Sequence, residues 1–384
     1  MKFIYNKNGD FIMKFKFFTS FMISALSLCA LSSCGEQPSE VIVKTVNVSD
    51  KTYVHPLGRT LVEKKDNLDM LYFANSCSGF SFDIDVESDL NLTFSLYGNV
   101  SSSYENQYAR VYVDGDELET LQIKNGVNDY TLENSISKGK HKIKLLKLNE
   151  PAFSQMGLLK IHEGDYSFKE YENEYTKKIE FYGDSITCGY GNLTDNSQPF
   201  SMETEDGAKA YTQLCADKLG YENSVVSYSG IAMALSPFNN TFTMLDRYKT
   251  VDGYKDWDFS NYVQDAIVIN IGTNDNTKLR SMTGNDYVDG ISKFYANLRE
   301  MTLNLKEYAP NAKFIFAYNM MLTINDGLAT CMESVCRELN EELDNEIAYV
   351  LEFAPNNNGA DGHPSVEGHE NATTVLADFI ESIM

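Results

Sequence analysis

Residues 179–192 read Ile-Glu-Phe-Tyr-Gly-Asp-Ser-Ile-Thr-Cys-Gly-Tyr-Gly-Asn and join a short apolar run to a glycine-rich turn. The run 179–182 predicts a buried strand. A serine that follows such a strand lies at the carboxyl edge of an open α/β sheet, where these folds position their reactive groups. Ser185 is therefore the candidate nucleophile, and it needs a nearby base to be activated.

The C-terminal part of the chain, residues 177–384, alternates strand and helix patterns. Apolar residues recur at helical spacing in 285–308 and in 366–383, which predicts a helix in each. Short apolar runs between the helical segments predict strands at 179–183, 223–228, 265–272, 312–319 and 347–353. Strands joined by crossover helices indicate a parallel, doubly wound sheet, hence a three-layer α/β/α domain with five parallel strands.

Residues 45–165 show a different pattern, in which apolar residues occupy every second position over short runs. The run 80–86, for example, places phenylalanine, isoleucine or valine at alternate positions. Period two is typical of half-buried strands, and turn signals such as Asp-Gly at 114–115 separate them. We therefore expect an all-β sandwich of jelly-roll type ahead of the α/β domain. The polar stretch 166–176 is predicted to be the linker.

The first 34 residues have the pattern of an export signal. Two lysines precede the apolar stretch 17–30, which is too short for a membrane span of ~20 residues. The stretch 31–35, Leu-Ser-Ser-Cys-Gly, resembles a bacterial lipobox, which implies that Cys34 is acylated. Residues 35–44 would then be a polar tether, and the protein would be anchored at the cell envelope, in the outer membrane or at the cell surface. The alternative is an ordinary signal peptide with an incidental cysteine.

Charge and cysteine content limit the classes of partner. The formal net charge is −23, and a chain this acidic repels nucleic acid and anionic lipid headgroups. The cysteines after the signal have spacings that indicate neither a metal site nor a disulfide framework. Cys188 is interpreted as a packing residue. We expect no metal and no cofactor.

Histidine is the usual base for a serine nucleophile, and one of the five histidines is well placed. His363 lies in the loop 359–365, after the last predicted strand and before the last helix. It therefore reaches the same sheet edge as Ser185, and Pro364 restricts its backbone to an extended form. His369 lies inside the last helix, where we expect an exposed surface position.

Acyl transfer also needs hydrogen-bond donors for the developing oxyanion. The backbone N–H of Ser185 is one candidate, and the N–H of Gly230, just after the strand 223–228, is a second. Asn274 follows the strand 265–272 and offers a side-chain amide. Taken alone, Asn274 could equally be part of a helix N-cap, but three strand ends that converge on one edge favour an oxyanion site.

These residues resemble the four sequence blocks of the SGNH (GDSL-type) hydrolases. The blocks are Gly-Asp-Ser at 183–185, Gly230, Gly-Thr-Asn-Asp at 272–275 and His-Pro at 363–364, so the resemblance spans 179–384. Each block alone is weak evidence for this family, but four blocks in the family's order make a specific resemblance. The alternative Gly-x-Ser-x-Gly elbow does not occur around a suitable nucleophile.

A narrower resemblance is to carbohydrate esterase family 2, the acetyl xylan esterase type. It rests on the stretches 183–192, Trp-Asp-Phe-Ser at 257–260 and Gly-Ala-Asp-Gly-His-Pro-Ser at 359–365. Gly-Arg-Thr at 58–60 is similar to the start of the β-sandwich that precedes the hydrolase domain in that family. The resemblance covers most of 53–384. It implies a serine esterase that deacetylates plant cell-wall polysaccharide, such as xylan or mannan, with polysaccharide or oligosaccharide as its partner.

Two departures from the family pattern concern the surroundings of His363. Most SGNH hydrolases have the orienting aspartate three residues before the histidine, a position that is Ala360 here. The resemblance to family 2 gives Asp361, two residues before, as the residue that orients His363, with a serine–histidine dyad as the alternative. The position before the histidine, often tryptophan in the family, is Gly362, and the chain has a single tryptophan. The candidate substrate-contacting residues are therefore Tyr190, Trp257 and Phe238.

Two other functions remain open. A lysophospholipase or thioesterase could use the same residues, although the polar stretch 192–196 after the nucleophile favours a short acyl group. A glycan-binding surface lipoprotein with an inactive hydrolase domain is the second alternative. In either case the sandwich could bind sugar or serve only as one wall of the cleft.

Overall fold

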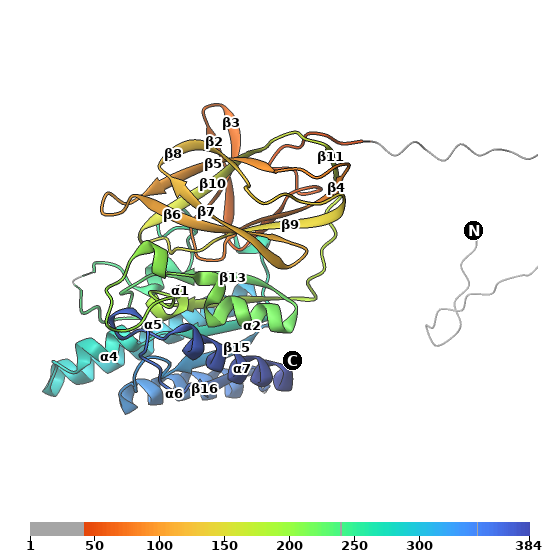
Figure 1. Ribbon diagram of the computed structural model, residues 1–384. Coiled ribbons are helices and arrows are strands. Elements are labelled where there is room, and N and C mark those ends of the chain that lie inside the picture. The colour runs from red at the N-terminus through yellow and green to blue at the C-terminus, as the bar shows by residue number, and fades with distance from the viewer. Residues whose placement is uncertain (1–41, 239, 344) are drawn as a thin grey trace, which may run out of the picture. The chain divides into compact units, whose positions relative to one another are not determined.

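The computed structural model describes residues 42–238, 240–343 and 345–384 (Figure 1). The predicted signal, the predicted lipobox and most of the expected tether lie outside the described residues. From Ile42 to Met384 the chain forms one compact unit, in which a β-sandwich is followed by an α/β domain.

The sandwich consists of two antiparallel sheets that enclose one apolar core. Alternate residues of the strands, such as Phe80, Phe82 and Phe94, are fully buried between the sheets, as their period-two pattern predicts. The first sheet has the order β1 (His55–Leu57), β4 (Gly79–Val86), β9 (Gly139–Lys147), β6 (Asn106–Val113), β7 (Asp116–Lys124), with β11 (Tyr166–Lys169) also on β4. The second has the order β2 (Thr60–Lys65), β3 (Leu68–Phe73), β10 (Ser154–Ile161), β5 (Thr93–Val100), β8 (Gly126–Thr131).

The limits of the sandwich differ from the prediction at both ends. Strand β11 pairs with β4, with Phe168 opposite Ile84, so residues 166–169 belong to the sandwich and not to the linker 166–176. Val43 forms a bridge with Phe168, and the ordered sandwich therefore begins before residue 45. The short strand β11 buries Tyr166 and Phe168 in the sandwich core, which is why it stays attached.

The α/β domain contains the predicted five-stranded parallel sheet. Its strand order is β13 (Tyr221–Ser227), β12 (Lys177–Gly183), β14 (Ala266–Asn270), β15 (Lys313–Tyr318), β16 (Ala348–Glu352), and all four pairings are parallel. The carboxyl ends of β12, β13 and β14 therefore lie side by side, which brings together the segments that follow them.

Helices cover both faces of this sheet. One face packs against α2 (Tyr211–Leu219) and α7 (Val366–Ile383), and the other against α5 (Gly284–Tyr308) and α6 (Asp326–Leu343). The shorter helices are α1 (Ser185–Cys188), α3 (Met244–Arg247) and α4 (Thr273–Leu279), with 3-10 turns η1 (Met202–Thr204), η2 (Gly207–Lys209), η3 (Phe259–Asn261) and η4 (Ala360–Gly362). The three-layer prediction is confirmed.

The two domains share part of their hydrophobic core. Met70, Tyr72 and Leu159 of the sandwich pack in one cluster with residues of the α/β domain such as Val226 and Trp257. Among the described residues, no helix is both long and apolar enough to cross a membrane.

Candidate active site

Ser185 is presented by a sharp change from strand to helix. Strand β12 ends at Gly183, and Asp184 caps the short helix α1 by accepting a hydrogen bond from the Ile186 N–H at 3.1 Å. Gly183 has no room for a side chain, because a Cβ there would lie 2.0 Å from Thr187 Oγ1. The chain therefore turns tightly, and Ser185, at the start of α1, is largely buried but lines the cleft.

The structure brings His363 to Ser185, 178 positions apart in the sequence. His363 Nε2 lies 2.9 Å from Ser185 Oγ. On the other side of the ring, Nδ1 lies 3.1 Å from the carbonyl oxygen of Ala360. A carbonyl can only accept, so Nδ1 carries the proton and Nε2 is free to accept the serine proton. The ring is thus held in the tautomer that a general base requires.

The electrostatics keep His363 neutral. Burial lowers the pKa of its imidazole below the usual 6.5, while the Ala360 carbonyl and the charge of Asp361 act in the opposite direction. A neutral imidazole at neutral pH can take a proton from Ser185 without first losing one.

The Asp361 carboxylate forms its hydrogen bonds with groups other than His363. Its Oδ2 accepts hydrogen bonds from the Tyr190 hydroxyl at 3.2 Å and from the Phe200 N–H at 3.4 Å. The backbone of Asp361 is left-handed, with φ 51° and ψ 27°, and this turn presents the Ala360 carbonyl to the imidazole. The arrangement is the serine–histidine dyad, with a main-chain oxygen in the place of the third member.

The three expected oxyanion donors lie around Ser185 in one cleft. Gly230 adopts φ +74°, and a Cβ there would lie 2.9 Å from Phe238 Cδ2, so the position favours glycine. The Asn274 amide donates to the Ile231 carbonyl at 2.8 Å and, more weakly, to Asp184 Oδ2 at 3.3 Å. The long contact to Asp184 is the one that a developing oxyanion could replace.

Asp275 has a role that the sequence reading did not assign. It is fully buried and accepts hydrogen bonds from the backbone N–H groups of Met233, Ala234 and Leu235 at 2.7–2.9 Å. Burial raises the pKa of its carboxyl to about 6. Asp275 thus fixes the segment that follows Gly230, and its place beside Asn274 in the third block was the available signal.

The cleft around Ser185 has a volume of about 490 Å³, and its lining combines aromatic and aliphatic side chains with the polar groups of the reactive site. Tyr190 and Phe238, both proposed from the sequence as substrate contacts, line it. The Tyr190 ring lies 4.3 Å from the His363 ring and stacks on Phe200 at 4.0 Å. Phe153, from the sandwich loop between β9 and β10, also lines the cleft and was not predicted. Nothing in the local sequence relates Phe153 to the hydrolase domain.

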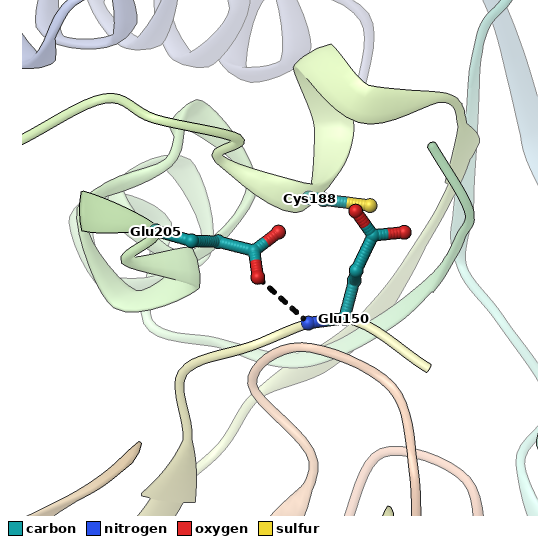
Figure 2. Close-up of side chains that lie close together, drawn as sticks. All are labelled: Glu150, Cys188 and Glu205. Carbon is teal, nitrogen blue, oxygen red and sulfur yellow. Dashed lines mark hydrogen bonds between the residues drawn. The ribbon is translucent and has the colours of Figure 1, made fainter. Parts of the chain in front are cut away.

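A buried group of potential metal ligands lies next to the active site (Figure 2). Ligand atoms of Glu150, Cys188 and Glu205 lie within 4.8 Å of one another. Lys147 is also fully buried, and its ammonium interacts favourably with both carboxylates. Burial lowers the pKa of Lys147 to about 7, while the charges of the two carboxylates act in the opposite direction, and the residues form one buried polar network. The Cys188 thiol is packed inside it and contacts Ser227 Oγ at 3.1 Å.

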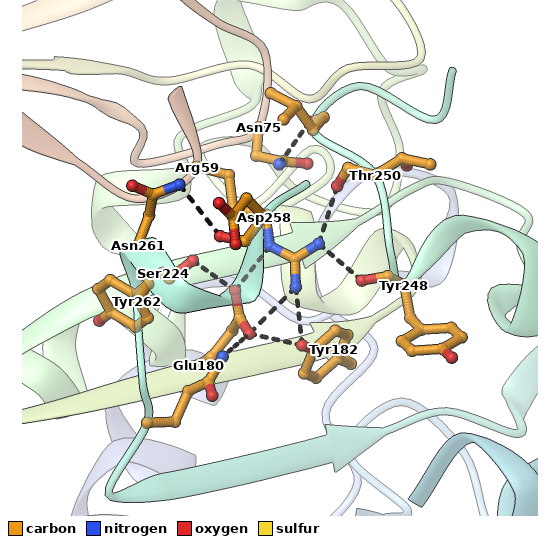
Figure 3. Close-up of polar contacts among 12 residues, drawn as sticks. Arg59, Asn75, Glu180, Tyr182, Ser224, Tyr248, Thr250, Asp258, Asn261 and Tyr262 are labelled. Carbon is orange, nitrogen blue, oxygen red and sulfur yellow. Dashed lines mark hydrogen bonds and ion pairs between the residues drawn. The ribbon is translucent and has the colours of Figure 1, made fainter. Parts of the chain in front are cut away.

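Trp257, predicted as a possible substrate contact, does not line the cleft around Ser185. Its side chain is buried and packs over the guanidinium of Arg59, 5.6 Å from the ring centroid. Figure 3 shows this Arg59, which comes from the sandwich and is fully buried in a polar network with Glu180 of β12. It also donates to the carbonyls of Tyr248 and Thr250 at 2.6 and 2.9 Å. The only tryptophan therefore serves the contact between the domains.

His369 is also placed differently from the prediction. It is fully buried, its Nδ1 accepts a hydrogen bond from the Tyr211 N–H at 3.1 Å, and burial lowers its pKa to about 3. It caps the start of α2, so it faces the inside of the domain.

Comparisons with known proteins find acylhydrolases and carbohydrate esterases. Residues 181–370 match the model of the GDSL-like Lipase/Acylhydrolase family. Cellulase/esterase CelE of Acetivibrio thermocellus is 27% identical over 300 residues, which are 74% of this chain and 35% of CelE. The chain thus spans about a third of that relative. An acetylxylan esterase / glucomannan deacetylase of Cellvibrio japonicus is 23% identical over 369 residues, covering 89% of this chain and 95% of the relative.

Solved structures share the two-domain fold. A family two carbohydrate esterase from Clostridium thermocellum in complex with cellohexaose superposes with a TM-score of 0.75 at 23% identity, covering 86% of this chain and 98% of that one. The acetyl xylan esterase Est2A from the rumen bacterium Butyrivibrio proteoclasticus gives a TM-score of 0.75 at 19% identity, covering 86% and 96%. At these identities the likeness concerns the fold.

Proposed function

Because residues 181–370 match the model of the GDSL-like Lipase/Acylhydrolase family, we propose that this protein is a serine esterase that removes O-acetyl groups from plant cell-wall polysaccharide of xylan or mannan type. The observation that carries the proposal is the 2.9 Å contact between His363 Nε2 and Ser185 Oγ in the cleft. The names of the relatives, acetylxylan esterase and glucomannan deacetylase, support the substrate class.

The geometry supports a two-step mechanism. Ser185 Oγ attacks the acetyl carbonyl carbon, and His363 Nε2 takes the serine proton. The carbonyl oxygen becomes an oxyanion, which the N–H groups of Ser185 and Gly230 and the amide of Asn274 stabilise. Collapse expels the sugar oxygen, which takes the proton from His363 and leaves an acetyl-enzyme. A water molecule, deprotonated by His363, then releases acetate and restores Ser185.

A second candidate function differs from the first in the length of the acyl group that the enzyme removes. Met321 and Leu322 line the cleft together with Phe153 and Phe238, and an apolar wall of this kind would accept an acyl group longer than acetyl. A lysophospholipase or thioesterase is therefore the competing proposal. Rates with p-nitrophenyl acetate and octanoate separate the two, since faster turnover of octanoate would contradict the acetylesterase.

The test of the function uses acetate release from acetylated xylan, mannan, pectin and peptidoglycan. We expect release from xylan or mannan, and a loss of activity of ~10³-fold or more in Ser185→Ala and in His363→Ala because each removes a member of the dyad. Wild-type turnover in Ser185→Ala would contradict the assignment. Binding of polysaccharide without acetate release by the wild-type protein would favour the glycan-binding alternative.

We also propose that the protein is exported and anchored through Cys34. The support is the apolar segment followed by Leu-Ser-Ser-Cys-Gly at 31–35. Expression in a bacterium fed labelled palmitate should label the wild-type protein in the membrane fraction and leave Cys34→Ala unlabelled. Equal labelling of both, or of neither, would contradict the anchor and leave an ordinary signal peptide.

A further inference from the structure

The loop between β9 and β10 of the sandwich places the carboxylate of Glu150 against Ser229, the residue before the proposed oxyanion donor Gly230. Glu150 is fully buried, and its Oε2 accepts a hydrogen bond from the Ser229 N–H at 2.6 Å. Its other oxygen, Oε1, accepts from the Ser229 hydroxyl. Ser229 directly precedes Gly230, so two bonds to one carboxylate fix the residue that leads into the oxyanion donor.

Glu150 is itself held by a second buried shell of polar groups. Its backbone N–H donates to Glu205 Oε2 at 3.2 Å, as the dashed line in Figure 2 shows. The Lys147 ammonium donates to the carbonyl oxygens of Asn149 and Glu150, and the Asn149 amide donates to Glu205 Oε2 at 3.3 Å. The loop is therefore fixed at both its main chain and its side chain.

Burial of the Glu150 carboxylate is energetically unfavourable, which indicates that Glu150 has a role beyond packing. A buried carboxylate is expensive unless charge and hydrogen bonds compensate for lost water. Burial raises the pKa of Glu150, and its hydrogen bonds with Ser229 lower it, as does the charge of Lys147. An apolar residue of similar size would fill the space with none of this compensation. What the carboxylate alone provides is two acceptors directed at Ser229.

We propose that Glu150 is a positioning residue for the oxyanion hole, through which the sandwich domain takes part in catalysis by the hydrolase domain. This inference rests on the proposed esterase function. Glu150 does not touch the substrate; it orients Ser229, and through it the N–H of Gly230. Because an oxyanion hole acts on the transition state, a misplaced Gly230 should lower kcat while KM stays nearly constant.

The test compares Glu150→Gln and Ser229→Ala with a matched control, Glu163→Gln, in the exposed loop after β10. Glutamine keeps one acceptor, and Ser229→Ala removes only the hydroxyl bond. We expect each to lower kcat for p-nitrophenyl acetate by ~10-fold or more, against ~10²–10³-fold for the complete loss of an oxyanion donor. KM, the thermal midpoint and the Glu163→Gln control should change little. Affinity for an alkylboronic acid, which forms a tetrahedral adduct with serine, should fall in parallel with kcat.

Unchanged kcat and boronate affinity in Ser229→Ala would overturn the inference, even if Glu150→Gln failed to fold. A lower thermal midpoint with unchanged kcat would likewise assign Glu150 a purely structural role. Ester hydrolysis by the wild-type protein distinguishes a failure of this inference from a failure of the proposed function. If it hydrolyses no ester, the function fails, and the relative rates at which a fluorophosphonate labels Ser185 in these variants still test the positioning role.

Discussion

His363 receives its orientation from a main-chain oxygen, and this changes which side chains matter around it. The Ala360 carbonyl lies 3.1 Å from Nδ1, whereas the Asp361 carboxylate bonds to Tyr190 and to the Phe200 N–H. A carbonyl cannot be removed by substitution of its own side chain. The tautomer of His363 therefore depends on the left-handed turn at Asp361 and Gly362, whose φ values are 51° and 76°.

Substitution of Asp361 tests this arrangement. Asp361→Asn should lower kcat/KM by ~10-fold or less, because the carboxylate acts on His363 only through its charge. That charge raises the pKa of His363, so its removal should lower the pKa further. Since the base must be neutral, the acidic limb of the kcat/KM profile should move to lower pH. A loss as large as that of His363→Ala would restore Asp361 as the orienting acid.

The sequence predicted the site residues that directly follow strands. It did not predict side-chain positions that depend on backbone conformation or on contacts with the other domain. Ser185, Gly230 and Asn274 each follow a parallel strand, and the topology brings them together with His363. The direction of the Asp361 carboxylate depends on a positive φ that spacing does not reveal. Trp257 and His369 are buried by tertiary contacts, and Glu150 and Phe153 come from a loop of the other domain.

At the scale of secondary-structure elements, segments with clear hydrophobic periodicity were assigned the correct element type, and their predicted boundaries lie close to the observed ones. The helices predicted at 285–308 and 366–383 are observed as Gly284–Tyr308 and Val366–Ile383. Both have an apolar face that packs on the sheet. Strand β11 was missed because it has only four residues and lies in a polar stretch, so its pairing with β4 depends on contacts that local sequence does not contain.

At the scale of the whole molecule, Arg59 links the sandwich to strand β12, which lies between β13 and β14. Its guanidinium contacts Glu180 Oε1 at 2.8 Å and the Tyr182 hydroxyl at 2.8 Å, and both Arg59 and Glu180 are fully buried (Figure 3). Such a pair is weak evidence of net stabilisation, because desolvation offsets the attraction. Removing one partner alone is costly, however, since it leaves the other charge buried.

Arg59→Met should therefore lower the free energy of unfolding by ~3–5 kcal/mol, measured by denaturant unfolding. The double variant Arg59→Met/Glu180→Gln should recover part of the loss, because no unpaired charge remains. Lys44→Ala, which breaks the exposed pair with Glu87, is the control and should cost less than ~1 kcal/mol. A loss in Arg59→Met no greater than in this control would show that the domains do not depend on the pair.

The depressed pKa of His363 also bears on how the protein would tolerate its own product. In the proposed reaction each turnover releases acetic acid, which acidifies unbuffered surroundings such as the interior of a polysaccharide particle. An imidazole of ordinary pKa 6.5 would become protonated as that acid accumulates, and the reaction would slow itself. Because burial lowers the pKa of His363, the base stays neutral over a wider acidic range. Deacetylation could then continue where diffusion removes acetate slowly.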